Sequence, residues 1–186
     1  AAYADLLERY RNVVSLHISG RLSSTVESAR TAAAGFGGRV LVHDTLVVSA
    51  SLALVIEAVQ RMLDRGTTAA EIDAFIRAIP SRSGCTFGVD TLEHLQRNGR
   101  IGKGQALVGG WLGVRPILAL QDGEVHPVGR VRGRRAMIPA IVEELTRRAA
   151  GFEHIDVAVI HADAPRDGER LLERIRDARG GIQTTR

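Results

Sequence analysis

In the first part of the chain, short apolar runs alternate with segments of helical periodicity. Val13 to Ile18 and Val40 to His43 have the length and apolar character of buried parallel strands. Apolar residues recur at helical spacing before, between and after these runs, at residues 2–11, 22–33, 48–63 and 67–79. Strands that alternate with helices are typical of a parallel sheet covered by helices. Residues 1–80 are therefore predicted to form a parallel, three-layer α/β lobe, whose last helix begins at Thr67 or Thr68 and ends before Pro80.

The pattern changes after Pro80. Asp122 and Gly123 separate two apolar runs, and an Asp-Gly pair in that position is a strong signal for a β-hairpin. Further strands are predicted at residues 85–89 and 155–161, and helices at residues 90–96, 105–112, 136–149 and 166–179. For residues 81–186 we predict a lobe built on a mixed sheet with helices on one face, which makes the fold class α/β with two lobes.

The composition, with 45% hydrophobic and 25% charged residues, is typical of a soluble globular protein. The sequence lacks an apolar run of the roughly 18 residues that a membrane span needs, and its first residues lack the pattern of a secretory signal. We therefore expect a cytoplasmic protein without an integral membrane segment. The histidines show no metal-ligand spacing, so no metal or cofactor is expected.

The net charge of +4 comes mainly from arginine, with one dense patch at Arg130, Arg132, Arg134 and Arg135. A basic patch leaves open a nucleic-acid-binding module. Aromatic residues make up only 4% of the chain, however, which leaves few side chains on which single-stranded bases could stack. We therefore expect no nucleic-acid partner and keep this function as a third hypothesis.

The turn between the first strand and its helix, residues 19–25, is the first candidate site. Ligands of parallel sheets gather at the carboxyl ends of the strands, where a helix N-terminus offers unpaired N–H groups and the positive end of its dipole. The serine hydroxyls in this turn are donors of the kind that a carboxylate or phosphate oxygen requires. A purely structural alternative is that Ser23 or Ser24 caps the helix.

The segment HISGRLSSTVESA at residues 17–29 resembles the DegV family, in which a strand ends in Ser and is followed by Leu-Ser-Gly-Thr and a helix. Further matches follow in the family's order: His43-Asp44-Thr45 with Val48-Ser49, Val89-Asp90-Thr91-Leu92-Glu93-His94-Leu95, Asn98-Gly99-Arg100-Ile101, Arg115-Pro116-Ile117-Leu118, and Asp122-Gly123 leading to Val131-Arg132-Gly133. The resemblance therefore covers most of the sequence.

This resemblance implies a non-catalytic protein that binds a long-chain fatty acid. The family has two lobes, with the acyl chain in an apolar tunnel between them and the carboxylate held by hydroxyls and backbone amides. The family's carboxylate ligand in Leu-Ser-Gly-Thr corresponds to Ser23, and Ser24 stands where the family has glycine. Ser19 and Ser24, in the same turn, and Arg100 are further candidate ligand-binding residues.

The resemblance also implies a partner protein. In relatives that serve as the binding subunit of fatty acid kinase, arginines in the motifs matched by Arg100 and Arg132 work alongside the kinase subunit, which performs an ATP-dependent phosphorylation for phospholipid synthesis. Such arginines could steer an acidic partner or neutralise an acyl phosphate. The structural alternatives are that Arg100 bonds nearby carbonyls and that Arg132 lies on a solvated face.

Family motifs that hold the carboxylate also lie outside this sequence. The family opens with a strand and an Asp-Ser-Thr motif, followed by a Thr-Ser-Gln-Pro loop, and closes with His-x-Gly-Pro-Gly; the sequence is therefore expected to be a piece of a longer protein. A second functional hypothesis is an α/β enzyme that acts on a small phosphorylated substrate held at Ser23 and Ser24.

Overall fold

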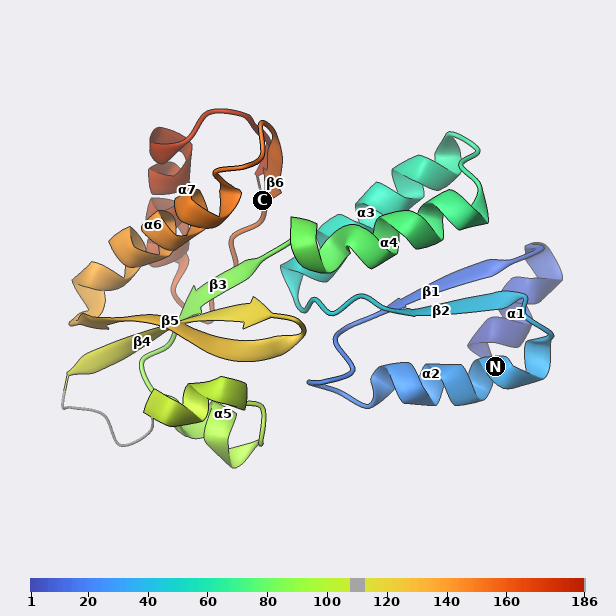
Figure 1. The fold of residues 1–186 in the computed structure, drawn as a ribbon, viewed down its shortest axis with the longest axis horizontal. Coiled ribbons are helices and arrows are strands. Elements are labelled where there is room, and N and C mark those ends of the chain that lie inside the picture. The colour runs from blue at the N-terminus through green and yellow to red at the C-terminus, as the bar shows by residue number, and fades with distance from the viewer. Residues whose placement is uncertain (108–112, 186) are drawn as a thin grey trace. The chain divides into compact units, whose positions relative to one another are not determined.

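The computed structural model describes residues 1–107 and 113–185, so that most of the predicted helix at 105–112 lies outside the described residues. The chain divides into two compact units, Ala1–Ser83 and Gly84–Arg186, whose elements are labelled in Figure 1. Each unit has its own sheets and helices, and each is described by itself.

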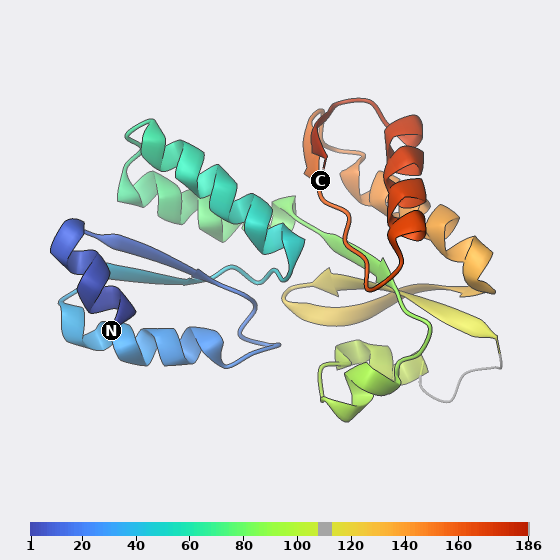
Figure 2. The same cartoon turned by 180° about the vertical axis from the view of Figure 1, so that it is seen from behind.

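The first unit is a parallel α/β structure. Strands β1 (Val13–His17) and β2 (Val40–Asp44) pair in parallel, from Val13 opposite Val40 to His17 opposite Asp44. The helices of this unit are α1 (Ala2–Arg9), α2 (Thr25–Ala33), the short 3₁₀ helix η1 (Ala34–Phe36), α3 (Ala50–Asp64) and α4 (Ala69–Arg82). Helix α2 covers one face of the strand pair, and α3 and α4 cover the other (Figures 1 and 2). The predicted three-layer arrangement is confirmed.

Apolar periodicity explains how these helices pack. Helix α3 buries Val55 and Val59, which lie one helical turn apart, and α2 buries Val26 and Ala29. Buried apolar area of this kind is the main stabilising contribution to such a layer, at roughly 25 cal/mol per Å². The helices therefore bind the sheet through the apolar faces that the sequence pattern predicts.

Helix α4 begins as predicted and ends later than predicted. Thr68 and Glu71 form a capping box, in which the Glu71 N–H donates to Thr68 Oγ1 at 3.3 Å and the Thr68 N–H donates to Glu71 Oε2 at 2.9 Å. The predicted end before Pro80 was wrong, because α4 continues through Pro80 to Arg82. The buried Ile79 lies in this last turn, and its carbonyl accepts a hydrogen bond from the Ser83 N–H at 2.8 Å.

The second unit contains a three-stranded antiparallel sheet and a separate parallel strand pair. Strands β3 (Cys85–Gly88), β4 (Val114–Gln121) and β5 (Glu124–Arg132) form the first; β6 (Ile155–Val157) and β7 (Ile182–Thr185) form the second. Its helices are α5 (Glu93–Arg97), η2 (Gly102–Leu107), η3 (Arg134–Ala136), α6 (Met137–Ala149) and α7 (Pro165–Ala178). The predicted strand at 155–161 ends at Val157, and β7 was not predicted.

The predicted hairpin is confirmed, with positive φ at both Asp122 (48°) and Gly123 (80°). The prediction of helices on one face only was wrong for this unit. Ile117 and Leu118 on β4 point to opposite faces and are both buried. Figure 1 shows α6 and α7 over one face and α5 with η2 on the other.

Candidate functional site

Two turns meet at the carboxyl end of the parallel strand pair. One follows β1 and leads into α2, and the other follows β2 and leads into α3. The Ser19 N–H donates to the Val47 carbonyl at 2.9 Å, and Thr45 Oγ1 donates to the His17 carbonyl at 2.7 Å. Because the strands are parallel, both turns lie at the same edge of the sheet, where ligands of such sheets bind.

Ser19 stabilises the first turn through hydrogen bonds in its interior. Its side chain is fully buried, and its Oγ accepts a hydrogen bond from the Arg21 N–H at 3.2 Å. Its carbonyl oxygen accepts from the N–H groups of Leu22, at 3.0 Å, and Ser23, at 3.1 Å. Ser19, a predicted ligand-binding residue, is therefore buried and stabilises the backbone of the turn instead of lying on its surface.

Three hydroxyl groups lie where this turn enters α2. Ser23 is half-buried, while Ser24 and Thr25 are exposed. The hydroxyls of Ser23 and Thr25 share a short hydrogen bond, and the Thr25 N–H also donates to Ser23 Oγ at 3.3 Å. Ser24 occupies the N-cap position, yet among the described residues its hydroxyl caps no N–H of this helix. Thr25 lies in the predicted turn but was not among the predicted ligand-binding residues, although its spacing from Ser23 permits this local bond.

Most backbone amides of the turn already have acceptors within the protein. The N–H groups from Ser19 through Ser23 all donate to neighbouring carbonyl or side-chain oxygens. The expectation that the amides beside Ser23 would hold a carboxylate therefore needs correction for these positions. The donors that this site can direct to an anion are the hydroxyls at the start of α2 and the N–H groups of its first turn, which the Ser24 side chain does not cap, supported by the positive end of the helix dipole.

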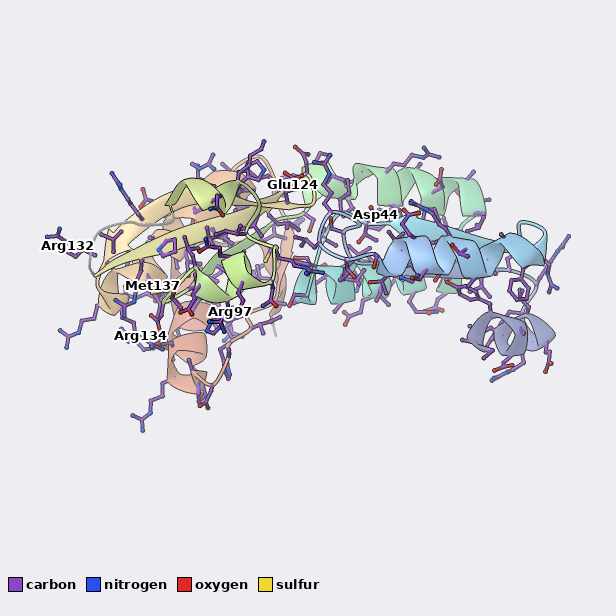
Figure 3. The ribbon with its side chains drawn as sticks, turned by 90° about the horizontal axis from the view of Figure 1, so that it is seen from below. Asp44, Arg97, Glu124, Arg132, Arg134 and Met137 are labelled. Carbon is purple, nitrogen blue, oxygen red and sulfur yellow. The ribbon has the colours of Figure 1, made fainter. Side chains whose placement is uncertain are left out.

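Asp44 connects the two turns through both of its carboxylate oxygens. Its Oδ2 accepts from the Gly20 N–H at 3.1 Å, and its Oδ1 accepts from the Leu46 N–H at 3.0 Å. A Cβ on Gly20 would lie 2.7 Å from Asp44 Oδ2 and 3.0 Å from Val26 Cγ1, so any larger residue here would have to displace one of these side chains. Figure 3 labels Asp44 near the start of α2.

Two histidines lie near this end of the strands. Burial lowers the pKa of His17, the positive charge of Arg30 lowers it further, and Asp44 opposes the shift. Burial likewise lowers the pKa of His43, against the opposing effect of Asp73, whose Oδ1 lies 3.6 Å from His43 Nδ1. Both rings are therefore neutral at pH 7, so an anion here would depend on hydrogen bonds rather than on a histidine charge.

The predicted arginines belong to the second unit. Arg100 is exposed and its Nη1 donates to the Asn98 carbonyl, as the structural alternative predicted. Arg132 is exposed at the end of β5, and its side chain extends away from the sheet (Figure 3). The structure thus brings Ser19, Ser23 and Ser24 together in one turn, and places Arg100 and Arg132 on the other unit.

The arginine patch is partly neutralised by acidic residues that are distant in sequence. Arg134 lies 3.3 Å from Asp90 Oδ2 and 2.9 Å from Asp167 Oδ2, and Arg115 Nε donates to Asp90 Oδ1 at 2.6 Å. The hydrogen bond from Arg115 lowers the pKa of Asp90, and the charges of Arg115 and Arg134 lower it further. This pairing reduces the positive charge available to a nucleic acid.

Residues 1–107 and 113–185 contain neither a cluster of metal-ligating side chains nor a helix that could span a membrane. Within those ranges, no three His, Cys, Asp or Glu side chains are grouped so that they could hold a metal ion. None of the helices there is long and apolar enough to cross a membrane.

Comparison with known proteins places the chain in a family. The model of the uncharacterised protein family DegV matches residues 1–184. The chain belongs to the DegV family. A DegV domain-containing protein of Deinococcus radiodurans is 42% identical over 146 residues, which cover 78% of this chain and 52% of the relative. One of Streptomyces coelicolor is 37% identical over 173 residues, covering 91% of this chain and 60% of the relative.

Solved structures of DegV proteins share the fold. A DegV family protein from Thermus thermophilus, described as binding fatty acid, superposes with a TM-score of 0.93 at 32% identity, over 99% of this chain and 66% of that one. The Bacillus subtilis DegV, described as a fatty acid binding protein, gives a TM-score of 0.82 at 25% identity, over 99% and 67%. This DegV chain spans about half to two thirds of the length of these relatives.

Proposed function

We propose that this DegV protein binds a long-chain fatty acid and that Ser23 contacts the carboxylate. The observation that carries the proposal is the TM-score of 0.93, over 99% of the chain, with a Thermus thermophilus protein described as binding fatty acid. The hydroxyl groups at the start of α2 supply a local chemistry that suits this ligand.

A fatty acid carboxylate that leaves water loses its hydration and needs donors in return. Ser23 and Thr25 offer two hydroxyls that are already hydrogen-bonded to each other, and the exposed Ser24 hydroxyl lies between them in sequence. The positive end of the α2 dipole adds a favourable field for an anion. In this proposal Ser23 and Ser24 contact the ligand, Thr25 orients Ser23, and Ser19 shapes the turn.

The proposal includes the role of a carrier. This DegV protein would act in the cytoplasm as a non-catalytic subunit that presents the fatty acid carboxylate to a separate ATP-dependent kinase for phospholipid synthesis. Arg132 supports a partner contact, because it is exposed and no acidic side chain pairs with it among the described residues. Arg100 is a second candidate for the partner contact, although it also bonds within its own loop.

The decisive experiment is to purify the full-length protein from its native cells, extract the bound small molecules and identify them by mass spectrometry. A stoichiometric long-chain fatty acid is the expected result. Recovery of a small phosphorylated compound without fatty acid would instead favour the enzyme hypothesis at the same hydroxyls. Absence of bound lipid, together with no binding of added oleate in calorimetry, would refute the proposed function.

A further inference from the structure

We infer that Asp44 is the positioning residue of this carboxylate site. The inference rests on the proposed function, and it concerns a residue that does not itself touch the ligand. Asp44 Oδ2 accepts from the Gly20 N–H at 3.1 Å, in the turn that carries Ser23. Asp44 Oδ1 accepts from the Leu46 N–H at 3.0 Å, in the turn that leads to α3. The Asp44 carboxylate therefore connects the turn after β1 with the turn after β2, which are distant in the sequence.

The path from Asp44 to Ser23 is short and consists of hydrogen bonds. Gly20, which Asp44 holds, directly follows Ser19, and the Ser19 carbonyl accepts from the Ser23 N–H at 3.1 Å. A shift of Gly20 would move this carbonyl and, with it, the backbone that aims Ser23 Oγ. Hydrogen bonds that a ligand makes to such hydroxyls weaken steeply with poor distance or angle. Asp44 thus acts on the ligand through the geometry of Ser23.

The second oxygen of Asp44 keeps its own turn in an unusual conformation. Leu46 has a φ of +54°, a left-handed conformation that is uncommon for a residue other than glycine. The hydrogen bond from its N–H to Asp44 Oδ1 stabilises this conformation, in the manner of an Asx turn. The next residue, Val47, accepts from the Ser19 N–H at 2.9 Å, so this turn also supports Ser19.

The chemistry of the two acceptors favours aspartate over its neutral analogue. A carboxylate accepts hydrogen bonds at both oxygens, whereas an asparagine amide presents one acceptor and one NH₂ donor. An asparagine at this position would therefore set an NH₂ group against either the Gly20 or the Leu46 N–H. The charge of Asp44 by itself would repel a nearby fatty acid anion. Positioning and charge consequently predict opposite effects of Asp44→Asn on carboxylate binding.

The test compares oleate with oleyl alcohol, which has the same chain and a neutral end. Affinities for both are measured by calorimetry for the parent protein, Ser23→Ala, Asp44→Asn, Asp44→Ala and the double variant Ser23→Ala with Asp44→Ala. Asp64→Ala is the matched control, because Asp64 is an exposed carboxylate at the other end of α3 that accepts from Gln60 Nε2. Thermal unfolding of each variant measures whether the fold is retained.

Asp44→Asn and Asp44→Ala should each lower the preference for oleate over oleyl alcohol by about ten-fold, while the affinity for the alcohol stays nearly constant. The double variant should lose little beyond Ser23→Ala, because both changes act on one hydroxyl. Asp64→Ala should keep the parent's preference.

The other outcomes overturn the inference or separate it from the proposed function. A loss of preference in Ser23→Ala but not in the Asp44 variants would refute positioning and leave the proposed function standing. Tighter oleate binding by Asp44→Asn would show that its charge, and not its geometry, acts on the ligand. Equal loss of oleate and alcohol binding in Asp44→Asn would assign Asp44 to the fold. An unchanged preference in every variant would place the carboxylate elsewhere, which would overturn both the role of Asp44 and the contact of Ser23 while leaving fatty acid binding itself standing.

Discussion

Ser23 and Thr25 share a hydroxyl–hydroxyl hydrogen bond at the entrance of α2. A hydroxyl that is already held by a neighbour loses less rotational freedom when it binds a ligand, and this reduces the entropic cost of binding. The pair is also local, because two residues at this spacing can bond wherever a turn enters a helix. Because Thr25 already orients the Ser23 hydroxyl, removal of that hydroxyl should have a measurable effect on binding.

Ser23→Ala should lower the affinity for oleate by about 1 to 3 kcal/mol, the range for a hydrogen bond to a charged group. The fold should survive, since the Ser23 side chain makes only local hydrogen bonds to Thr25, and such a bond contributes about 1 kcal/mol. Isothermal calorimetry measures the affinity. Ser28→Ala is the matched control, because Ser28 is an exposed serine one turn further along α2 that bonds only the Ser24 carbonyl among the described residues. Parent-like oleate affinity in Ser23→Ala would reduce Ser23 to a structural residue.

Gly20→Ala should destabilise the first unit by about 1 to 3 kcal/mol, because the added methyl group overlaps Asp44 Oδ2 and presses on Val26 Cγ1. Urea unfolding followed by circular dichroism provides the measurement. Gly35→Ala is the control, since no described atom lies within 4 Å of a Cβ there. If both variants unfold at the same urea concentration as the parent, the close approach of Gly20 to Asp44 is not a constraint in solution.

Arg132→Ala should weaken productive coupling to the kinase while leaving oleate affinity nearly unchanged, because the side chain is exposed on the second unit. Acyl phosphate formation with the purified kinase subunit, measured beside oleate binding, tests this. Arg97→Ala removes an exposed arginine that pairs with Glu93 in the same unit, and it should couple normally. Parallel loss of lipid binding and coupling in Arg132→Ala would make Arg132 a structural residue.

The free energy of unfolding should fall as the pH drops below about 6.5, the ordinary pKa of histidine. Burial lowers the pKa of His43 in the folded protein, so the unfolded chain binds more protons between that lowered value and 6.5. Stability therefore rises with pH through this window, with a slope below about 1.4 kcal/mol per pH unit for one proton.

His43→Gln should flatten this part of the pH profile, which denaturant unfolding at a series of pH values would record. His154→Gln is the control, because the His154 side chain is 55% exposed, and it should keep the slope of the parent. An unchanged slope in His43→Gln would show that His43 does not contribute to the pH dependence.

Local patterns in the sequence were sufficient for the order of the elements and for several of their ends. The alternation of apolar runs predicted β1 and β2 with their helices, Asp122 and Gly123 predicted the hairpin, and Thr68 was a correct helix cap. These features depend on residues within a few positions of one another, which is why a linear pattern contains them. The resemblance to the DegV family was likewise carried by short motifs and is confirmed.

Tertiary structure alone decided how the site is built. Asp44 bonds the amide of Gly20, 24 residues earlier, and Asp90 pairs with Arg134, 44 residues later. The burial of Ser19 and the internal bonding of the turn amides likewise arise only when the two turns meet. Such contacts depend on where the parallel pairing brings distant strand ends, and neither spacing nor residue type records that placement. The sequence by itself therefore determined which hydroxyls lie at the start of α2, whereas the fold determined which of them are exposed and what holds them in place.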